Sequence, residues 1–284
     1  MKLMAGLVTA FLLIASCSPE ASEPIAVGSY DFAENQLLAE IAAQSLESAG
    51  YAVVRLPSFQ TRAEALDAFE AGESDVMVEY LGSLSTHLGQ PPTEDVSGTM
   101  DGVRDAAEVA GVKLLTPASI DTAPAVVVLR STAEALGLET ISDLHDLAES
   151  FDIGAKQDCP IDEQCLLGLY RTYGLTFRSF VPLDAGGPLS VRALKEREVN
   201  VAVLFNSDSA LAGDELKVLV DDRDLMATEA LVPMVALTMD DARQRVVETS
   251  LLELTLAELR LLVGRIETGE LTVVNAAEEY LSSR

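Results

Sequence analysis

Cys159 and Cys165 stand six residues apart in the run DCPIDEQC, a spacing that can support covalent chemistry. In an oxidising compartment outside the cytoplasm, such a pair is expected to form a disulfide. The bond would close a short loop and stabilise the fold by about 2 kcal/mol. Two free thiols are the alternative, whereas a zinc site is disfavoured because no histidine lies nearby.

The third cysteine, Cys17, follows a segment that is typical of a bacterial secretion signal. Lys2 gives a positive start, residues 3–15 are apolar, and Ile-Ala-Ser precedes the cysteine. The apolar run is short for a transmembrane helix, which needs about 20 residues. The tetrad is similar to a lipobox, so we predict a lipoprotein signal peptide over 1–17, diacylation of Cys17 and a tether over 18–24. The alternative is an ordinary cleaved signal with Cys17 near the cut by chance.

Side-chain groupings typical of an enzyme are not found in the sequence. His145 lies on the polar side of an expected helix and is predicted to be a surface residue. His87 follows a strand end, where a surface position and a site role are both open. No nucleophile elbow, zinc-binding helix, phosphate loop or dinucleotide fingerprint occurs. We therefore predict that the protein is not an enzyme and uses no cofactor or metal.

The chain is strongly acidic, with 46 acidic against 19 basic residues and a formal net charge of −27. A negative field of this size repels nucleic acids and anionic membrane surfaces. We therefore predict no nucleic-acid partner and membrane attachment only through the lipid anchor. The charge weakly favours cationic solutes, although most of the carboxylates are expected to lie on solvated helix faces.

Short apolar runs alternate with amphipathic helices along the mature chain. Strands are expected at 25–27, 51–56, 75–79, 112–115, 125–129, 152–155, 177–183, 199–205 and 216–220. One helix is expected to end at 49, and the next is expected to start in a capping box formed by Thr61 and Glu64. Further helices are expected at 100–110, from Ser142 onward, at 163–173 and at 191–197. Residues 230–237 open a mostly helical end with helices at 240–249, 251–266 and 276–281. This alternation predicts parallel-rich sheets covered on both faces.

Two such α/β units predict a two-lobed binding protein whose chain crosses between the lobes twice. The crossings are expected near 121–124 and 228–233, short proline-bearing segments that can act as hinges. Lobe I would comprise 25–122 and 229–284, and lobe II 123–228. Ligands in such lobes bind at the carboxyl ends of strands.

Five stretches, in the same order, resemble those of a known family. Residues 27–51 are similar to its Gly-Ser-x-x-Phe-x-Glu start, and residues 75–89 to its Glu-Tyr-x-Gly element. LGLETISDL, YGLTF and VAVLFNSDSAL follow. The chain thus resembles the substrate-binding proteins of ABC transporters for glycine betaine, choline, carnitine and related osmoprotectants. The resemblance implies a type II periplasmic-binding-protein fold that captures a small solute by lobe closure and passes it to an ABC permease with its ATPase subunits. We expect a monomer, exported and lipid-anchored.

The resemblance also implies a cage of aromatic side chains. A quaternary ammonium group donates no hydrogen bonds, so aromatic faces hold it, each good contact contributing about 0.5–2 kcal/mol. Tyr80 matches a cage tyrosine of the family, and Tyr30 is expected to supply a second ring. Asp208 is a further candidate, with an ordinary helix cap as its alternative role. The expected ligand-binding residues are Ser29, Tyr30, Tyr80, Asp121, Thr122, Asn206, Asp208 and Glu229.

Three departures from the family pattern affect the expected ligand. The first crossover has 121–124 (DTAP) where the family commonly has Asn-Asn-Thr-Tyr, and Glu229 stands where a tyrosine is common. Residues 160–163 (PIDE) replace the segment that often supplies an arginine for a carboxylate. Because acidic groups attract cations and repel carboxylates, we predict a cation such as choline over glycine betaine. The alternative is a sensor or structural lipoprotein with a different small cationic ligand.

Overall fold

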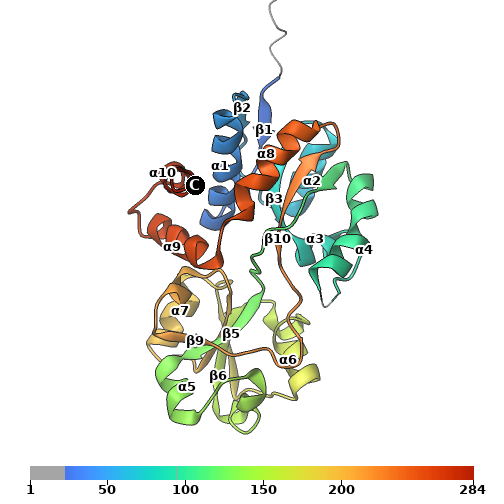
Figure 1. Cartoon of the computed structure of the whole chain (residues 1–284). Coiled ribbons are helices and arrows are strands. Elements are labelled where there is room, and N and C mark those ends of the chain that lie inside the picture. The colour runs from blue at the N-terminus through green and yellow to red at the C-terminus, as the bar shows by residue number, and fades with distance from the viewer. Residues whose placement is uncertain (1–22, 94) are drawn as a thin grey trace, which may run out of the picture.

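The computed structural model describes residues 23–93 and 95–284, so the predicted signal peptide, Cys17 and most of the tether lie outside the described residues. Within that range the chain forms two lobes, each built on a five-stranded sheet flanked by helices (Figure 1). The predicted two-lobed α/β fold is thus confirmed. None of the described helices is long and apolar enough to cross a membrane.

Lobe I contains both ends of the described chain. Its sheet has the order β2-β1-β3-β10-β4, formed by β1 (Ile25–Val27), β2 (Val53–Arg55), β3 (Val76–Tyr80), β4 (Val112–Leu114) and β10 (Leu231–Ala236). The helices α1 (Ala33–Ser48), α8 (Asp241–Leu252), α9 (Leu256–Glu267) and α10 (Val273–Ser282) pack together. A second apolar cluster lies under α2 (Arg62–Glu70), α3 (Leu81–His87) and α4 (Val96–Val109).

Lobe II is the smaller unit, inserted between β4 and β10. Its sheet has the order β7-β6-β8-β5-β9, formed by β5 (Pro124–Leu129), β6 (Asp152–Lys156), β7 (Ser179–Leu183), β8 (Val201–Phe205) and β9 (Leu216–Val218). The α-helices are α5 (Arg130–Leu136), α6 (Leu166–Tyr173) and α7 (Pro188–Lys195). Four short 3-10 turns complete it: η1 (Ile141–Leu144), η2 (Ala148–Ser150), η3 (Cys159–Ile161) and η4 (Ser209–Ala212). The predicted disulfide between Cys159 and Cys165 is present, with both residues buried.

The sheets are mixed, and the strands that break the parallel pattern are those that follow a crossover. Pairing is parallel between β1 and both β2 and β3, and between β6 and both β7 and β8. Strand β5 runs antiparallel to β8 and β9, and β10 runs antiparallel to β3 and β4. Each of these two strands enters its sheet from the other lobe. It therefore starts at the edge where the parallel strands end.

Among the described helices, a side-chain cap marks the start of α2, α4, α8, α9 and α10. Thr61 and Glu64 form the predicted capping box at the start of α2, since the Thr61 hydroxyl accepts from the Glu64 amide at 3.2 Å. The helix predicted from Ser142 is wrong, because that segment forms the 3-10 turns η1 and η2. Ile141 and Leu144, three residues apart, both lie in the lobe II core, and the threefold period of a 3-10 turn places them on one side.

The two crossover segments lie side by side and form a narrow waist between the lobes (Figure 1). Asp121 and Ala230 form an antiparallel bridge. The amide and hydroxyl of Thr122 both donate to the Glu229 carbonyl, at 3.1 and 2.9 Å. This pairing brings residues from both crossings to the same point between the lobes.

Candidate ligand-binding site

A cleft of about 370 Å³ lies where the lobes and the waist meet. Lobe I supplies most of its wall, from the loops after β1 and β2 and from the segment that joins β3 to α3. The waist and the end of β8 in lobe II supply the rest. The lining residues are Tyr30, Phe32, Glu34, Gln60, Thr61, Arg62, Tyr80, Ser83, Thr122, Phe205, Ser207 and Glu229. A cleft of this volume suits a small solute.

Aromatic rings cover one side of the cleft. Tyr30 and Phe32 stack with their centroids 6.1 Å apart and their planes at 7°. Phe32 and Tyr80 are also 6.1 Å apart, tilted by 33°. Phe205 lines the cleft from lobe II. The cleft therefore contains the two tyrosines that the sequence singled out and two further phenylalanines, a set of π faces suited to a cation.

The hydroxyl of Tyr80 is held by a buried carboxylate. It donates to Glu34 Oε1 at 2.7 Å, and Glu34 lies in the first turn of α1. Burial raises the pKa of Glu34, the hydroxyls of Ser207 and Tyr80 oppose that shift, and the Glu267 carboxylate adds to it. Because Ser207 belongs to lobe II, Glu34 lies where the two lobes approach each other. A cation in the cleft would favour the ionised form of this group.

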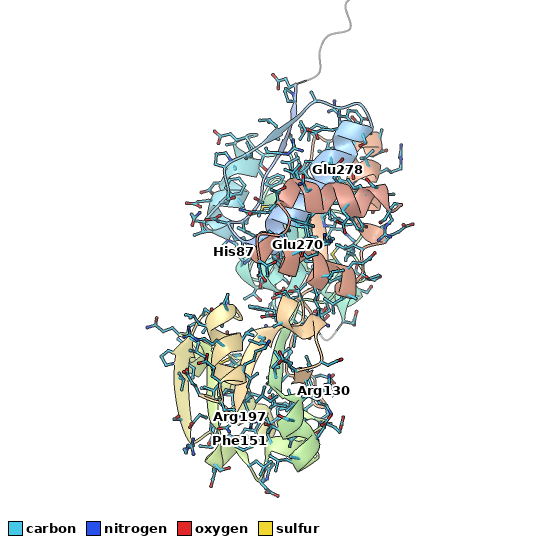
Figure 2. The ribbon with its side chains drawn as sticks, turned by 90° about the vertical axis from the view of Figure 1, so that its left-hand side faces the viewer. His87, Arg130, Phe151, Arg197, Glu270 and Glu278 are labelled. Carbon is cyan, nitrogen blue, oxygen red and sulfur yellow. A yellow bond between two sulfur atoms is a disulfide. The ribbon has the colours of Figure 1, made fainter. Side chains whose placement is uncertain are left out.

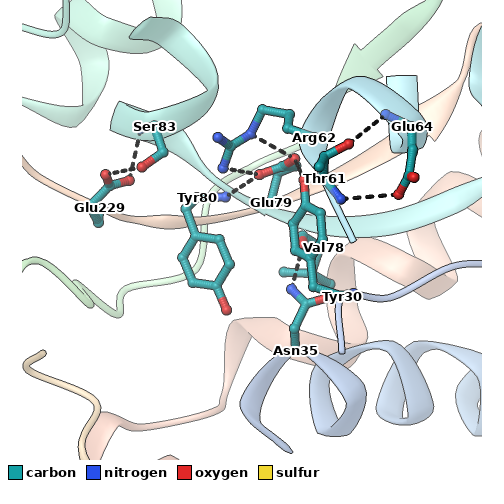
Figure 3. A network of polar contacts seen from close by, with 10 residues as sticks. All are labelled: Tyr30, Asn35, Thr61, Arg62, Glu64, Val78, Glu79, Tyr80, Ser83 and Glu229. Atoms are coloured by element: carbon teal, nitrogen blue, oxygen red, sulfur yellow. Dashed lines mark hydrogen bonds and ion pairs between the residues drawn. The ribbon is translucent and has the colours of Figure 1, made fainter. Parts of the chain in front are cut away.

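A second buried carboxylate, Glu79, anchors the other tyrosine. It accepts from the Tyr30 hydroxyl and pairs with Arg62 through two bonds, Nε to Oε1 at 3.0 Å and Nη2 to Oε2 at 3.1 Å (Figure 3). The Tyr30 backbone is fixed as well, because its amide donates to Asn35 Oδ1 at 2.8 Å. The aromatic wall of lobe I is therefore held in place by hydrogen bonds behind it.

Glu229 reaches the cleft from the second crossover. Its carboxylate accepts from the Ser83 amide at 3.0 Å and from the Ser83 hydroxyl at 2.5 Å (Figure 3). Burial raises the pKa of Glu229, while the bonds from Ser83 and the charge of Arg62 lower it. The glycine of the Glu-Tyr-x-Gly element permits this approach, since a Cβ on Gly82 would lie 2.6 Å from the Thr228 carbonyl oxygen.

Four of the eight predicted ligand-binding residues line the cleft: Tyr30, Tyr80, Thr122 and Glu229. Asp121 and Asn206 instead line a separate cavity of about 230 Å³ at the waist. The Oδ1 atom of Asp121 accepts from the amides of Ala123 at 3.0 Å and Glu229 at 2.8 Å, so this carboxylate shapes the hinge backbone.

The other two predicted residues have structural partners. Ser29 is buried, with its hydroxyl 3.4 Å from that of Ser58. Asp208 caps η4, accepting from the Ala210 amide at 2.8 Å, and burial raises its pKa to about 6. His87, at the end of α3, is exposed and does not line the cleft (Figure 2).

A further contact joins the lobes beside the cleft, where α9 packs against η4 (Figure 1). Arg260 Nε donates to the Asn206 carbonyl at 2.6 Å. The Ser209 hydroxyl donates to Glu267 Oε2 at 2.6 Å. These bonds connect helix α9 of lobe I to the segment after β8 in lobe II. They therefore depend on the position of one lobe relative to the other.

Two α/β lobes, a double crossover and an interlobe cleft define a type II periplasmic binding protein. The family model described as "Substrate binding domain of ABC-type glycine betaine transport system" matches residues 23–283, and the chain belongs to this family. It is therefore an extracytoplasmic substrate-binding protein of a glycine betaine-type ABC transporter, as the resemblance predicted. The family delivers small solutes to an ABC permease and is not enzymatic.

Individual relatives agree on the family and differ in their ligands. The chain is 29% identical over 229 residues to the glycine-betaine-binding protein of Pseudomonas aeruginosa, covering 75% of this chain and 72% of the relative. It is 26% identical over 225 residues to the ergothioneine transport permease/ergothioneine binding protein of Helicobacter pylori, and the match covers 75% of this chain and 39% of that relative. A crystal structure described as a glycine betaine/carnitine/choline ABC transporter has a TM-score of 0.83 at 19% identity, covering 91% of this chain and 98% of that one, which shows the fold.

The cleft residues that were not among the predicted ligand-binding residues include Phe32, Glu34 and Arg62. Phe32 and Glu34 are the Phe and Glu of the family's Gly-Ser-x-x-Phe-x-Glu start, so the motif itself was the signal for both. Arg62 offered no such signal, because it stands at the first position of an ordinary capped helix.

Proposed function

We propose that this protein captures a quaternary ammonium cation of the choline class and delivers it to an ABC importer, and that it favours such cations over zwitterionic betaines. One observation carries the proposal. The cleft combines four aromatic rings with the buried carboxyl groups of Glu34 and Glu229, while the guanidinium of Arg62 is already paired with Glu79.

The rings and the carboxyl groups act on the same part of the ligand. A trimethylammonium group spreads its charge over its methyl hydrogens and packs against π faces without needing an acceptor. The hydrogen-bond partners of Glu34 and Glu229 are hydroxyl and amide groups, and neither carboxyl group forms an ion pair with a basic side chain among the described residues. A cation placed between them gains attraction that a low-dielectric cleft screens weakly.

The same charges act against a carboxylate on the ligand. A carboxylate binds best to an arginine fork or to several N–H donors. Among the described residues that line the cleft, Arg62 is the one basic side chain, and Glu79 occupies two of its nitrogens. Choline carries a hydroxyl in place of the carboxylate, and that hydroxyl can donate to an acidic side chain.

Closure of the lobes is part of the proposal. We place lobe I at 25–122 with 229–284 and lobe II at 123–228, with the paired crossover segments as the hinge. The division between the two sheets and the pairing of Thr122 with Glu229 support these boundaries. A ligand that touches both lobes favours the closed form in proportion to the additional interactions it makes there.

Lipid anchoring at Cys17 also remains a proposal, supported by the IASC tetrad after an apolar run. Cells expressing the full chain would be labelled with a radioactive fatty acid, with Cys17→Ala as the control. We expect label in the wild-type protein only. Equal labelling of both proteins, or of neither, would refute lipidation at this residue.

Isothermal titration calorimetry tests the ligand class. The purified mature protein would be titrated with choline, glycine betaine, carnitine and ergothioneine, the last because of the Helicobacter pylori relative. Like glycine betaine, carnitine and ergothioneine carry a trimethylammonium group and a carboxylate, so we expect choline to bind more tightly than all three. Tighter binding of glycine betaine than of choline would overturn the proposed preference. Binding of none of the four would overturn the proposed ligand class.

A further inference from the structure

Glu79 lies behind the cleft wall, and its carboxylate is saturated with donors. Its side chain is fully buried and does not line the cleft. Oε1 accepts from the Tyr30 hydroxyl and from Arg62 Nε, and Oε2 accepts from Arg62 Nη2 and from the Tyr80 amide at 3.0 Å. One carboxylate therefore contacts three residues that form the ligand-binding wall (Figure 3).

The pairing determines what Arg62 can offer to a ligand. Its side chain is 21% exposed and lines the cleft, with Cζ 6.0 Å from the centre of the Tyr30 ring. Burial alone would disfavour its charge, but the Glu79 carboxylate outweighs that effect and raises the pKa of Arg62. The guanidinium is thus charged, and the Nε–Nη2 edge that matches a carboxylate faces Glu79.

We propose that Glu79 is a positioning residue that sets the charge class of the ligand. By holding one edge of the Arg62 guanidinium and balancing its charge, it weakens the attraction of this group for a ligand carboxylate, and the cleft stays selective for cations. This inference depends on the proposed function, because it explains how the same cleft discriminates between choline and a betaine.

The arrangement implies a defined consequence of removing the Glu79 charge. In Glu79→Gln, Arg62 would lose its partner and lie as a free cation at the edge of the cleft. A ligand carboxylate could then take the place of Glu79, whereas a cationic ligand would meet repulsion. The affinities for choline and glycine betaine should therefore move in opposite directions. A purely structural role of Glu79 would instead lower both affinities together.

The experiment measures dissociation constants for choline and glycine betaine in the mature protein and in three variants. We expect Glu79→Gln to shift the ratio of the two constants toward glycine betaine by about tenfold or more. The double variant Glu79→Gln with Arg62→Gln has no charge on either partner, and it should return the ratio to within about threefold of the wild-type value. Tyr170→Phe, at an exposed tyrosine that does not line the cleft, should leave the ratio unchanged.

Removing one partner of a buried ion pair can unfold a protein, so folding is checked by circular dichroism. If Glu79→Gln does not fold, Arg62→Lys replaces it. This variant keeps the charge pair but loses the fork, and its flexible ammonium should relax the ratio toward glycine betaine by about threefold. An unchanged ratio in whichever of these two variants folds overturns the inference, as does a parallel loss of both affinities. Failure of the wild-type protein to bind either ligand overturns the proposed function, and the inference with it.

Discussion

Phe32 offers a direct test of the aromatic cage, because its ring contributes to the cleft and little else. The side chain is 45% exposed and stands between the rings of Tyr30 and Tyr80, each 6.1 Å away. Phe32 occupies the N-cap position of α1 without making a capping hydrogen bond. Truncation to alanine should therefore change the free energy of unfolding little, since it removes a half-exposed ring and no polar contact.

The expected loss of affinity follows from the cation–π energy. One ring contributes about 0.5–2 kcal/mol, so Phe32→Ala should weaken choline binding by about 2- to 30-fold. Phe32→Leu keeps most of the apolar volume but has no π face and should show most of this loss. Phe32→Tyr keeps the π face and should bind nearly as well as the wild-type protein.

Calorimetric titration with choline, together with thermal unfolding, measures both quantities. Tyr170→Ala is a matched control, because this tyrosine is 61% exposed on α6 and does not line the cleft. We expect Tyr170→Ala to leave the affinity unchanged. Wild-type affinity in Phe32→Leu would show that the ring acts only through its volume, and the reasoning from π faces would then be wrong.

Four other changes test separate parts of the structure. Glu229→Gln removes a buried acidic group, which a bound cation would favour in its ionised form, and should weaken choline binding several-fold more than glycine betaine binding, measured by calorimetry. Arg260→Ala removes a bond between the lobes and should weaken ligand binding although it does not line the cleft, also measured by calorimetry. Burial raises the pKa of Asp208 to about 6. The free energy of unfolding therefore falls as the pH rises from about 4 to about 6, because the unfolded chain releases this proton more readily than the folded protein does. Asp208→Asn should raise the melting temperature at about pH 7 and not at about pH 4. Replacing Cys159 and Cys165 by serine should lower the free energy of unfolding by about 2 kcal/mol in a denaturant titration.

The architecture was largely accessible from the sequence because its signals are local. The capping box at Thr61, the strand–helix alternation and the proline-bearing crossovers each depend on a few neighbouring residues. The antiparallel direction of β5 and β10 was not accessible, because it follows from where the chain re-enters each sheet. The segment from Ser142 was misassigned because its apolar spacing fits a 3-10 turn as well as an α-helix.

The site was accessible only in part, because a position at the end of a strand does not determine where a side chain points. Asp121 and Thr122 are adjacent, yet Thr122 lines the cleft and the Asp121 carboxylate turns to the amides of the hinge. The pairing of Glu79 with Arg62 joins residues 17 positions apart on different elements. Glu79 is the glutamate of the Glu-Tyr-x-Gly element, but the motif does not identify its partner, because Arg62 lies outside it on another element.

The division of the site between the lobes determines which interactions can drive closure. Lobe I holds Tyr30 and Tyr80 through Glu79 and Glu34, so its aromatic wall needs no ligand to order it. A ligand shifts a conformational equilibrium only by the difference between its affinities for the two states. The wall of lobe I can touch the solute in the open and closed forms alike, and it sets how tightly the solute is first held. Under the proposed closure, the interactions that form only in the closed state come from lobe II, which contributes Phe205 and Ser207 to the cleft. We therefore expect these two residues to convert binding into the closed form that a permease can distinguish from the open one.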